Sequence, residues 1–165
     1  MGQQTSIKRV EGTFDVAPRS RFAIVASRFN QEVVERLLEG SIDALIRHGV
    51  DRTHVTVLSV PGAWEIPFGC EHVARRKNIS GIVAVGAVIR GETSHFERVA
   101  AESISGCARV MGKHGVPIGL GILTTESLAQ AMARAGGSMG NKGWEAALSA
   151  LEMASLAARL AGSNT

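Results

Sequence analysis

Short apolar runs alternate with stretches of helical periodicity along most of the chain. Three runs are apolar at almost every position, which is typical of parallel strands that are covered by helices on both faces, and a fourth run is rich in β-branched residues. The predicted strands are Arg21–Ser27, His54–Val60, Ile82–Ile89 and Pro117–Leu123. The last of them is rich in glycine, so we expect another part of the backbone to pack closely against it.

Apolar residues spaced three and four apart predict helices between and after these strands. The helices are expected at about 31–48, 64–77, 93–114, 128–132 and 144–158. We expect the Asn30 side chain to cap the first helix and Gly49 to end it. Thr93 and Ser94 are residues that commonly start a helix, here the one expected at 93–114. Gly136–Gly140 is expected to form a turn before the helix at 144–158.

Strands that alternate with helices predict parallel pairing through right-handed crossovers. The fold class is therefore α/β, a three-layer α/β/α sandwich around a central parallel four-stranded sheet. At 165 residues the chain is the size of one domain, and we assign residues 21–165 to it. Residues 1–20 are polar and weakly patterned, and we interpret them as an N-terminal arm or an edge strand.

Composition and charge narrow the classes of partner. The net charge of +3 comes from mixed acidic and basic residues, and the one basic run, Arg75–Lys77, fits a solvated helix end better than a nucleic-acid surface. No apolar stretch is long enough for a signal sequence or a membrane span, so we expect a cytoplasmic protein that binds neither nucleic acid nor membrane. Cys70 and Cys107 lack CxxC spacing and are expected to be small buried hydrophobic residues.

Three turns at the predicted carboxyl ends of parallel strands carry unusual residues. They are Ser27–Asn30, Pro61–Glu65 and Arg90–His95. These ends share one edge of the sheet, so the turns can converge on one pocket. Phe29 offers a flat apolar face, while Asn30 and Glu65 offer hydrogen bonds. Each also has a plain structural explanation: core packing, a helix cap and a first-turn acid, respectively.

His95 is the histidine whose position indicates a role in proton transfer. An imidazole exchanges protons near neutral pH, and this one follows a glycine turn at the start of a helix, where free N–H groups suit an anion. The alternative is a histidine at a helix N-terminus with no task. No histidine or carboxylate stands at metal-ligand spacing to it, so we expect no metal site. Dinucleotide and P-loop fingerprints are also absent from the sequence.

Five longer motifs stand out along the chain. They are SRFN, VPGAWEIP, GAVIRGETSHFE, GILTTESLAQAMARAG and GNKGWEAA, which begin at residues 27, 60, 86, 121 and 140. Together they resemble the 6,7-dimethyl-8-ribityllumazine synthase family of riboflavin biosynthesis, and the resemblance runs from about Arg21 to Leu160.

The resemblance implies a flavodoxin-like fold and a transferase without metal or organic cofactor. It implies condensation of 5-amino-6-(D-ribitylamino)uracil with 3,4-dihydroxy-2-butanone 4-phosphate to 6,7-dimethyl-8-ribityllumazine, with release of phosphate and water. It also implies pentamers with active sites between adjacent subunits. Riboflavin synthase is a candidate partner on the same grounds.

Residue roles follow from the same resemblance. Phe29 would stack on the pyrimidine, Glu92 and Thr93 would hold phosphate, and His95 would move protons. The ring and the ribityl chain would contact a second group of residues, namely Asn30, Ala63, Trp64, Glu65, Ala87, Val88 and Ile89. The neighbouring chain would supply Leu120 to the pyrimidine, and Arg134 and Lys142 to the phosphate.

Two features keep alternatives open. Leu120 stands where many family members have phenylalanine, which could weaken substrate binding and favour a lumazine- or flavin-binding module with weak turnover. The turn Gly136–Gly140 lacks the extra residues that the resemblance associates with members that stop at pentamers. A sixty-subunit icosahedral shell, or a protein that is mainly a shell-forming container, therefore stays open.

Overall fold

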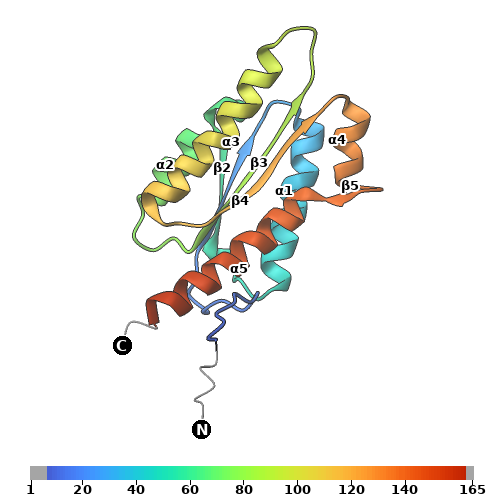
Figure 1. The fold of residues 1–165 in the computed structure, drawn as a ribbon. Coiled ribbons are helices and arrows are strands. Elements are labelled where there is room, and N and C mark those ends of the chain that lie inside the picture. Colours follow the sequence, from blue (N-terminus) through green and yellow to red (C-terminus); the bar gives the residue numbers. More distant parts are fainter. Residues whose placement is uncertain (1–6, 163–165) are drawn as a thin grey trace.

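A four-stranded parallel sheet occupies the centre of the molecule in a computed structural model, which describes residues 7–162 (Figure 1). The strands pair in the order β2-β1-β3-β4. Their bounds are β1 Phe22–Ser27, β2 Val55–Val60, β3 Gly81–Ile89 and β4 Ile118–Thr125. The four predicted strands are confirmed, and the last begins one residue later and continues two residues further than predicted.

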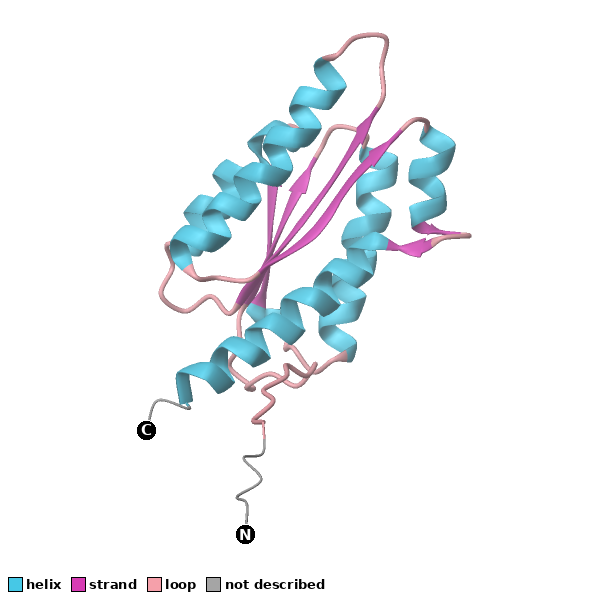
Figure 2. Cartoon of the chain, in the orientation of Figure 1, coloured by secondary structure: helices cyan, strands magenta, loops and turns pink. Residues whose placement is uncertain are grey.

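Helices cover both faces of this sheet, as Figure 2 shows. One face carries α1 (Gln31–Arg47) and α5 (Lys142–Gly162), and the other carries α2 (Ile66–Ala74) and α3 (His95–His114). The three-layer α/β/α sandwich is confirmed, and the strand order is that of a flavodoxin-like fold.

Alternate side chains of the central strands divide the core into two halves. Phe22 and Ile24 of β1 point to the α1/α5 layer, while Ala23 and Val25 point to the α2/α3 layer, and all four are buried. This period of two along a strand that is apolar at every position explains why the runs have no polar face. The sheet is thereby a fixed platform for the turns at its edge.

The glycines of β4 allow α5 to approach the sheet closely. A Cβ atom on Gly119 would overlap the carbonyl oxygen of Ala146 in α5. The predicted close backbone contact at this strand is therefore confirmed.

Three connecting segments differ from their predictions. Residues Ala63–Glu65 form a 3-10 turn, η2, and α2 ends at Ala74, so the basic run at 75–77 lies beyond the helix. The segment predicted as a plain turn at 136–140 is part of a hairpin, because β5 (Ala135–Gly137) pairs with β6 (Gly140–Asn141) after the short helix α4 (Leu128–Arg134). Gly136 and Gly140 take positive φ angles there, which glycine adopts without strain. A further 3-10 turn, η1 (Arg52–His54), leads into β2.

The N-terminal segment forms no strand within its described residues, 7–20. It lies on the end of α5, where the amide of Thr13 donates to Ser155 Oγ at 3.3 Å and Arg159 donates to the carbonyl of Glu11 at 3.0 Å. Residues 1–6 of the predicted arm lie outside the described residues, and its role on a neighbouring subunit stays a prediction. Within residues 7–162, no helix has the length and apolar character that a membrane crossing requires.

Both cysteines are buried free thiols, as predicted, and they lie on the packed helices α2 and α3. The pKa of Cys70 is raised by its hydrogen bond with Cys107 and by burial. The raised pKa keeps the Cys70 thiol protonated, and burial keeps both sulfur atoms away from the surface.

Candidate active site

The sheet has one point at which its strand order changes direction. From β1 the chain crosses to β2 on one side and then returns to β3 on the other. The chain leaves β1 toward α1 on one face and β3 toward α3 on the other face, and open α/β sheets bind ligands at such a point. A cavity of about 460 Å³ lies at this edge of the sheet.

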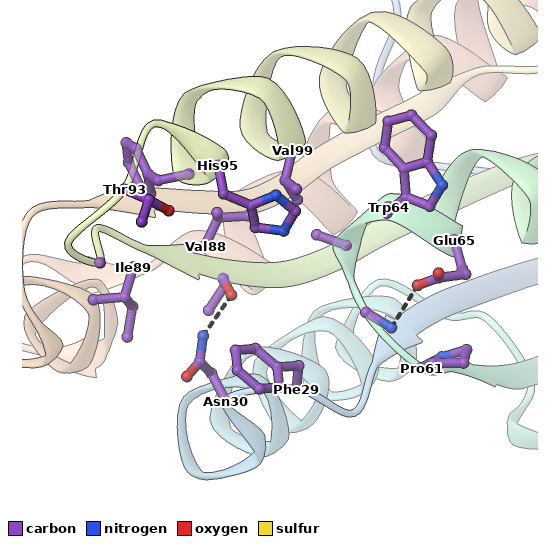
Figure 3. Close-up of a pocket in the computed structure, with 15 residues that line it drawn as sticks. Phe29, Asn30, Pro61, Trp64, Glu65, Val88, Ile89, Thr93, His95 and Val99 are labelled. Carbon is purple, nitrogen blue, oxygen red and sulfur yellow. Dashed lines mark hydrogen bonds between the residues drawn. The ribbon is translucent and has the colours of Figure 1, made fainter.

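Side chains from three turns converge on this cavity (Figure 3). The turn after β1, the turn after β2, the end of β3 and the start of α3 all contribute. The lining residues are Phe29, Asn30, Pro61, Gly62, Ala63, Trp64, Glu65, Ala87, Val88, Ile89, Gly91, Thr93, His95, Phe96 and Val99. The predicted convergence of the three turns on one pocket is therefore confirmed.

The turn after β1 presents an aromatic ring to the cavity. Phe29 is 72% exposed, although its backbone is fixed because its N–H donates to the carbonyl of Pro61 at 3.0 Å. The predicted side-chain cap at Asn30 is wrong. Asn30 takes a left-handed conformation (φ 58°), and its Nδ2 donates to the carbonyl of Ala87 at 2.8 Å instead of capping α1. The amide thus ties the β1 turn to the end of β3.

The turn after β2 closes one end of the cavity. The Glu65 carboxylate accepts a hydrogen bond from the N–H of Gly62 at 2.8 Å (Figure 3), so it fixes the backbone of this turn. Ala63 is buried beneath it, while Trp64 is 60% exposed. The plain explanation of Glu65 as a first-turn acid is therefore incomplete, because the side chain also holds the turn in shape.

The end of β3 forms the floor. Its ladder with β1 stops at the pair Ala26–Val85, whereas its ladder with β4 continues to Ile89–Thr125. Residues Ala87–Ile89 therefore extend past β1 and line the cavity. A strand edge presents N–H and C=O groups at fixed spacing, which suits a flat heterocycle that has donors and acceptors on its rim.

His95 is the first residue of α3 and extends into the cavity. In Figure 3 its imidazole lies above the end of β3, and the Phe29 ring lies on the other side of that strand end. Ser94 precedes the helix without making a side-chain cap, so the first N–H groups of α3 lack a capping side chain. Thr93 and Gly91 lie beside them. The arrangement combines a proton carrier with N–H donors that suit an anion.

Four residues that the resemblance assigns to the site do not line this cavity. Glu92 lies in the turn between β3 and α3 but is not among the residues that line the cavity. Leu120 is a half-exposed residue of β4. Arg134 is the last residue of α4, and its guanidinium donates to the carbonyl of Gln130 at 3.1 Å. Lys142 is the first residue of α5, and its Nζ lies 2.5 Å from Glu145 Oε2.

The structure also adds lining residues that the sequence did not single out as site residues. They are Phe96 and Val99. Val99 lies four residues after His95 and therefore shares its face of α3, and this spacing was the available signal. Phe96 follows His95 directly, and helical spacing does not predict its contact with the cavity. Among the described residues, no group of three histidine, cysteine, aspartate or glutamate side chains is placed to hold a metal ion.

Comparison with known families gives one match. A family model described as 6,7-dimethyl-8-ribityllumazine synthase matches residues 19–158. The matched region contains the whole sheet and every residue that lines the cavity.

Proposed function

Because the chain belongs to the 6,7-dimethyl-8-ribityllumazine synthase family, we propose that it makes this lumazine from two substrates. It joins 5-amino-6-(D-ribitylamino)uracil to 3,4-dihydroxy-2-butanone 4-phosphate, with release of phosphate and water. Members of this family are transferases of riboflavin biosynthesis.

The observation that carries the proposal is the pairing of Phe29 and His95 across one cavity. An exposed ring with a fixed backbone can stack on a pyrimidine without ordering a loop first. We assign the rim of the pyrimidine to the backbone of Ala87–Ile89. Asn30 and the turn Ala63–Glu65 take the rest of the ring and the ribityl chain, since both face the same cavity.

The phosphorylated substrate fits the other end of the cavity. The turn after Gly91 and the start of α3 offer N–H donors and the positive end of a helix dipole. We assign the phosphate to Thr93 and to the backbone of Glu92. The Glu92 carboxylate would repel a dianion, so we assign this contact to the backbone N–H of Glu92, which lies between the lining residues Gly91 and Thr93.

His95 then serves the proton transfers. The substrate amine attacks the ketone, and loss of water gives an imine. Removal of the proton beside the leaving group expels phosphate and leaves an enol, which takes up a proton to become a ketone. The ribitylamino nitrogen then attacks this ketone, and loss of a second water closes the ring. An imidazole can both accept and donate protons at neutral pH. Binding both substrates in the orientation that the reaction needs also raises the rate, because it makes the first step effectively unimolecular.

The proposal includes a second chain. Leu120, Arg134 and Lys142 do not line the cavity of their own chain, and we assign them to the site of a neighbour in a cytoplasmic pentamer or a pentamer-based shell. Riboflavin synthase, which would consume the product, is the partner that this proposal implies.

The test is turnover with both substrates. Purified full-length protein should form the lumazine, followed by its absorbance, far above the background of the two substrates alone. Tight binding of the lumazine without turnover would instead support the binding module that Leu120 suggests. Light scattering on the same sample separates a pentamer from a shell, and either result is compatible with catalysis.

A further inference from the structure

Arg90 links three segments around the candidate site. It is the first residue after β3, and its backbone N–H donates to the carbonyl of Thr125 at the end of β4, at 2.9 Å. Its guanidinium donates to Glu126 at 2.6 Å and to Glu97 of α3 at 3.2 Å. The guanidinium carbon also lies 4.6 Å from the centre of the Phe96 ring.

The two α3 contacts fall on the turn that begins with His95. Phe96 and Val99 pack against the edge of the core there, but Ser94 makes no side-chain cap and the first fully buried residue of α3 is Ala100. Phe96 also lines the cavity. The planar guanidinium group of an arginine that contacts both a carboxylate and an aromatic ring fixes the orientation of these side chains as well as their separation.

We propose that Arg90 is a positioning residue, which clamps the first turn of α3 to the end of β4 and so sets where the His95 imidazole stands. The proposal rests on the proposed function for its kinetic consequence only. Arg90 does not line the cavity, so it acts through His95 and Phe96 and not on substrate.

The clamp should matter for the geometry of the site and hardly at all for stability. An isolated exposed pair contributes little to stability, and the side chains of Glu97 and Glu126 are both more than half exposed. Loss of the clamp should therefore leave the melting temperature nearly unchanged while the geometry of the site suffers. A misplacement of about 1 Å can lower a rate by roughly 10²-fold, and we expect a loss of about tenfold because the body of α3 stays packed.

The experiment compares three variants of the full chain. Arg90→Gln removes the fork, Arg90→Lys keeps the charge without the fork, and Arg109→Gln is the matched control, since Arg109 makes an exposed ion pair with Glu102 at 3.2 Å further along the same helix. We expect both Arg90 variants to lose about tenfold in kcat with an unchanged KM for the pyrimidine, and Arg109→Gln to behave as the unmodified protein. Recovery of kcat in Arg90→Lys, or normal kcat in Arg90→Gln, would overturn the proposal.

Amide hydrogen exchange gives a readout that needs no turnover. The N–H groups of Arg98 and Val99 make the first hydrogen bonds within α3. They should exchange faster in both Arg90 variants and at the normal rate in Arg109→Gln. If the protein makes no lumazine, the proposed function fails while this measurement still decides the clamp, and unchanged exchange in Arg90→Gln would refute it.

Discussion

Replacing Phe29 with alanine should weaken binding of the pyrimidine substrate while leaving the fold intact. The ring keeps 72% of its surface exposed in the chain, so little buried area is lost from the folded state. Its backbone N–H still donates to Pro61, and alanine does not disturb that bond. We expect the melting temperature to change by no more than about 2 °C.

The size of the binding effect follows from what the ring can contact. Burying a whole phenylalanine side chain is worth about 1.5–3 kcal/mol, and a ligand stacked on one face covers roughly half of it, or about 1 kcal/mol. Aromatic stacking adds about 0.5–1.5 kcal/mol. Together these give about 1.5–2.5 kcal/mol, which is roughly a 10- to 60-fold rise in Kd for the pyrimidine.

The assay is titration of the pyrimidine substrate in the absence of the second substrate, followed by steady-state kinetics with both. Phe68→Ala is the matched control, because Phe68 is 67% exposed on α2 and does not line the cavity. Gel filtration of both variants checks that assembly is unchanged. A normal pyrimidine Kd in Phe29→Ala, or an equal rise in Phe68→Ala, would show that the stacking assignment is wrong.

Three further substitutions test other parts of the argument. His95→Ala should lower kcat by about 10²-fold or less, because substrate orientation survives without the imidazole; unchanged turnover would leave His95 as a helix N-terminal histidine with no task. Arg134→Ala should raise the KM of the phosphorylated substrate far more than that of the pyrimidine, and equal effects on both would remove its assignment to phosphate. Hydrogen bonds from Lys113 and His114 lower the pKa of Glu71 from 4.5 to about 2. The carboxylate therefore stabilises the fold fully above pH 4.5 and loses this contribution as the pH falls toward 2. The melting temperature of Glu71→Gln should accordingly lie below that of the unmodified protein at pH 7 and approach it over this interval, whereas a constant difference would contradict the ion-pair explanation.

The sheet and the position of the site were predictable from local patterns. Three strands are mostly apolar and β2 is rich in β-branched residues, and each strand carries its turn at the carboxyl end. Parallel pairing is enough to bring Phe29 and His95 to the same edge, although they lie far apart in the sequence. The strand order, which places both beside the change of direction between β1 and β3, came only with the structure.

The contacts that shape the site were not predictable in the same way. Asn30 was expected to cap a helix because asparagine commonly does so, but its amide bonds to Ala87, a residue 57 positions away. Arg90 likewise bonds to Glu126, 36 positions away. Such partners depend on how separate strands meet in space, and the periodicity of a single segment holds no information about them.

The charges of the cavity support the proposal that a second chain completes the site. Among the described residues that line it, none is lysine or arginine, and the charged neighbour Arg90 is occupied by two carboxylates. A dianionic phosphate would therefore meet N–H groups, Thr93 and His95, but no lysine or arginine. In the proposed function Arg134 and Lys142 would supply the positive charge, although they lie on α4 and α5, outside this cavity. A second copy that presents these two residues would complete the phosphate site, and this is why Arg134→Ala should discriminate so strongly between the two substrates.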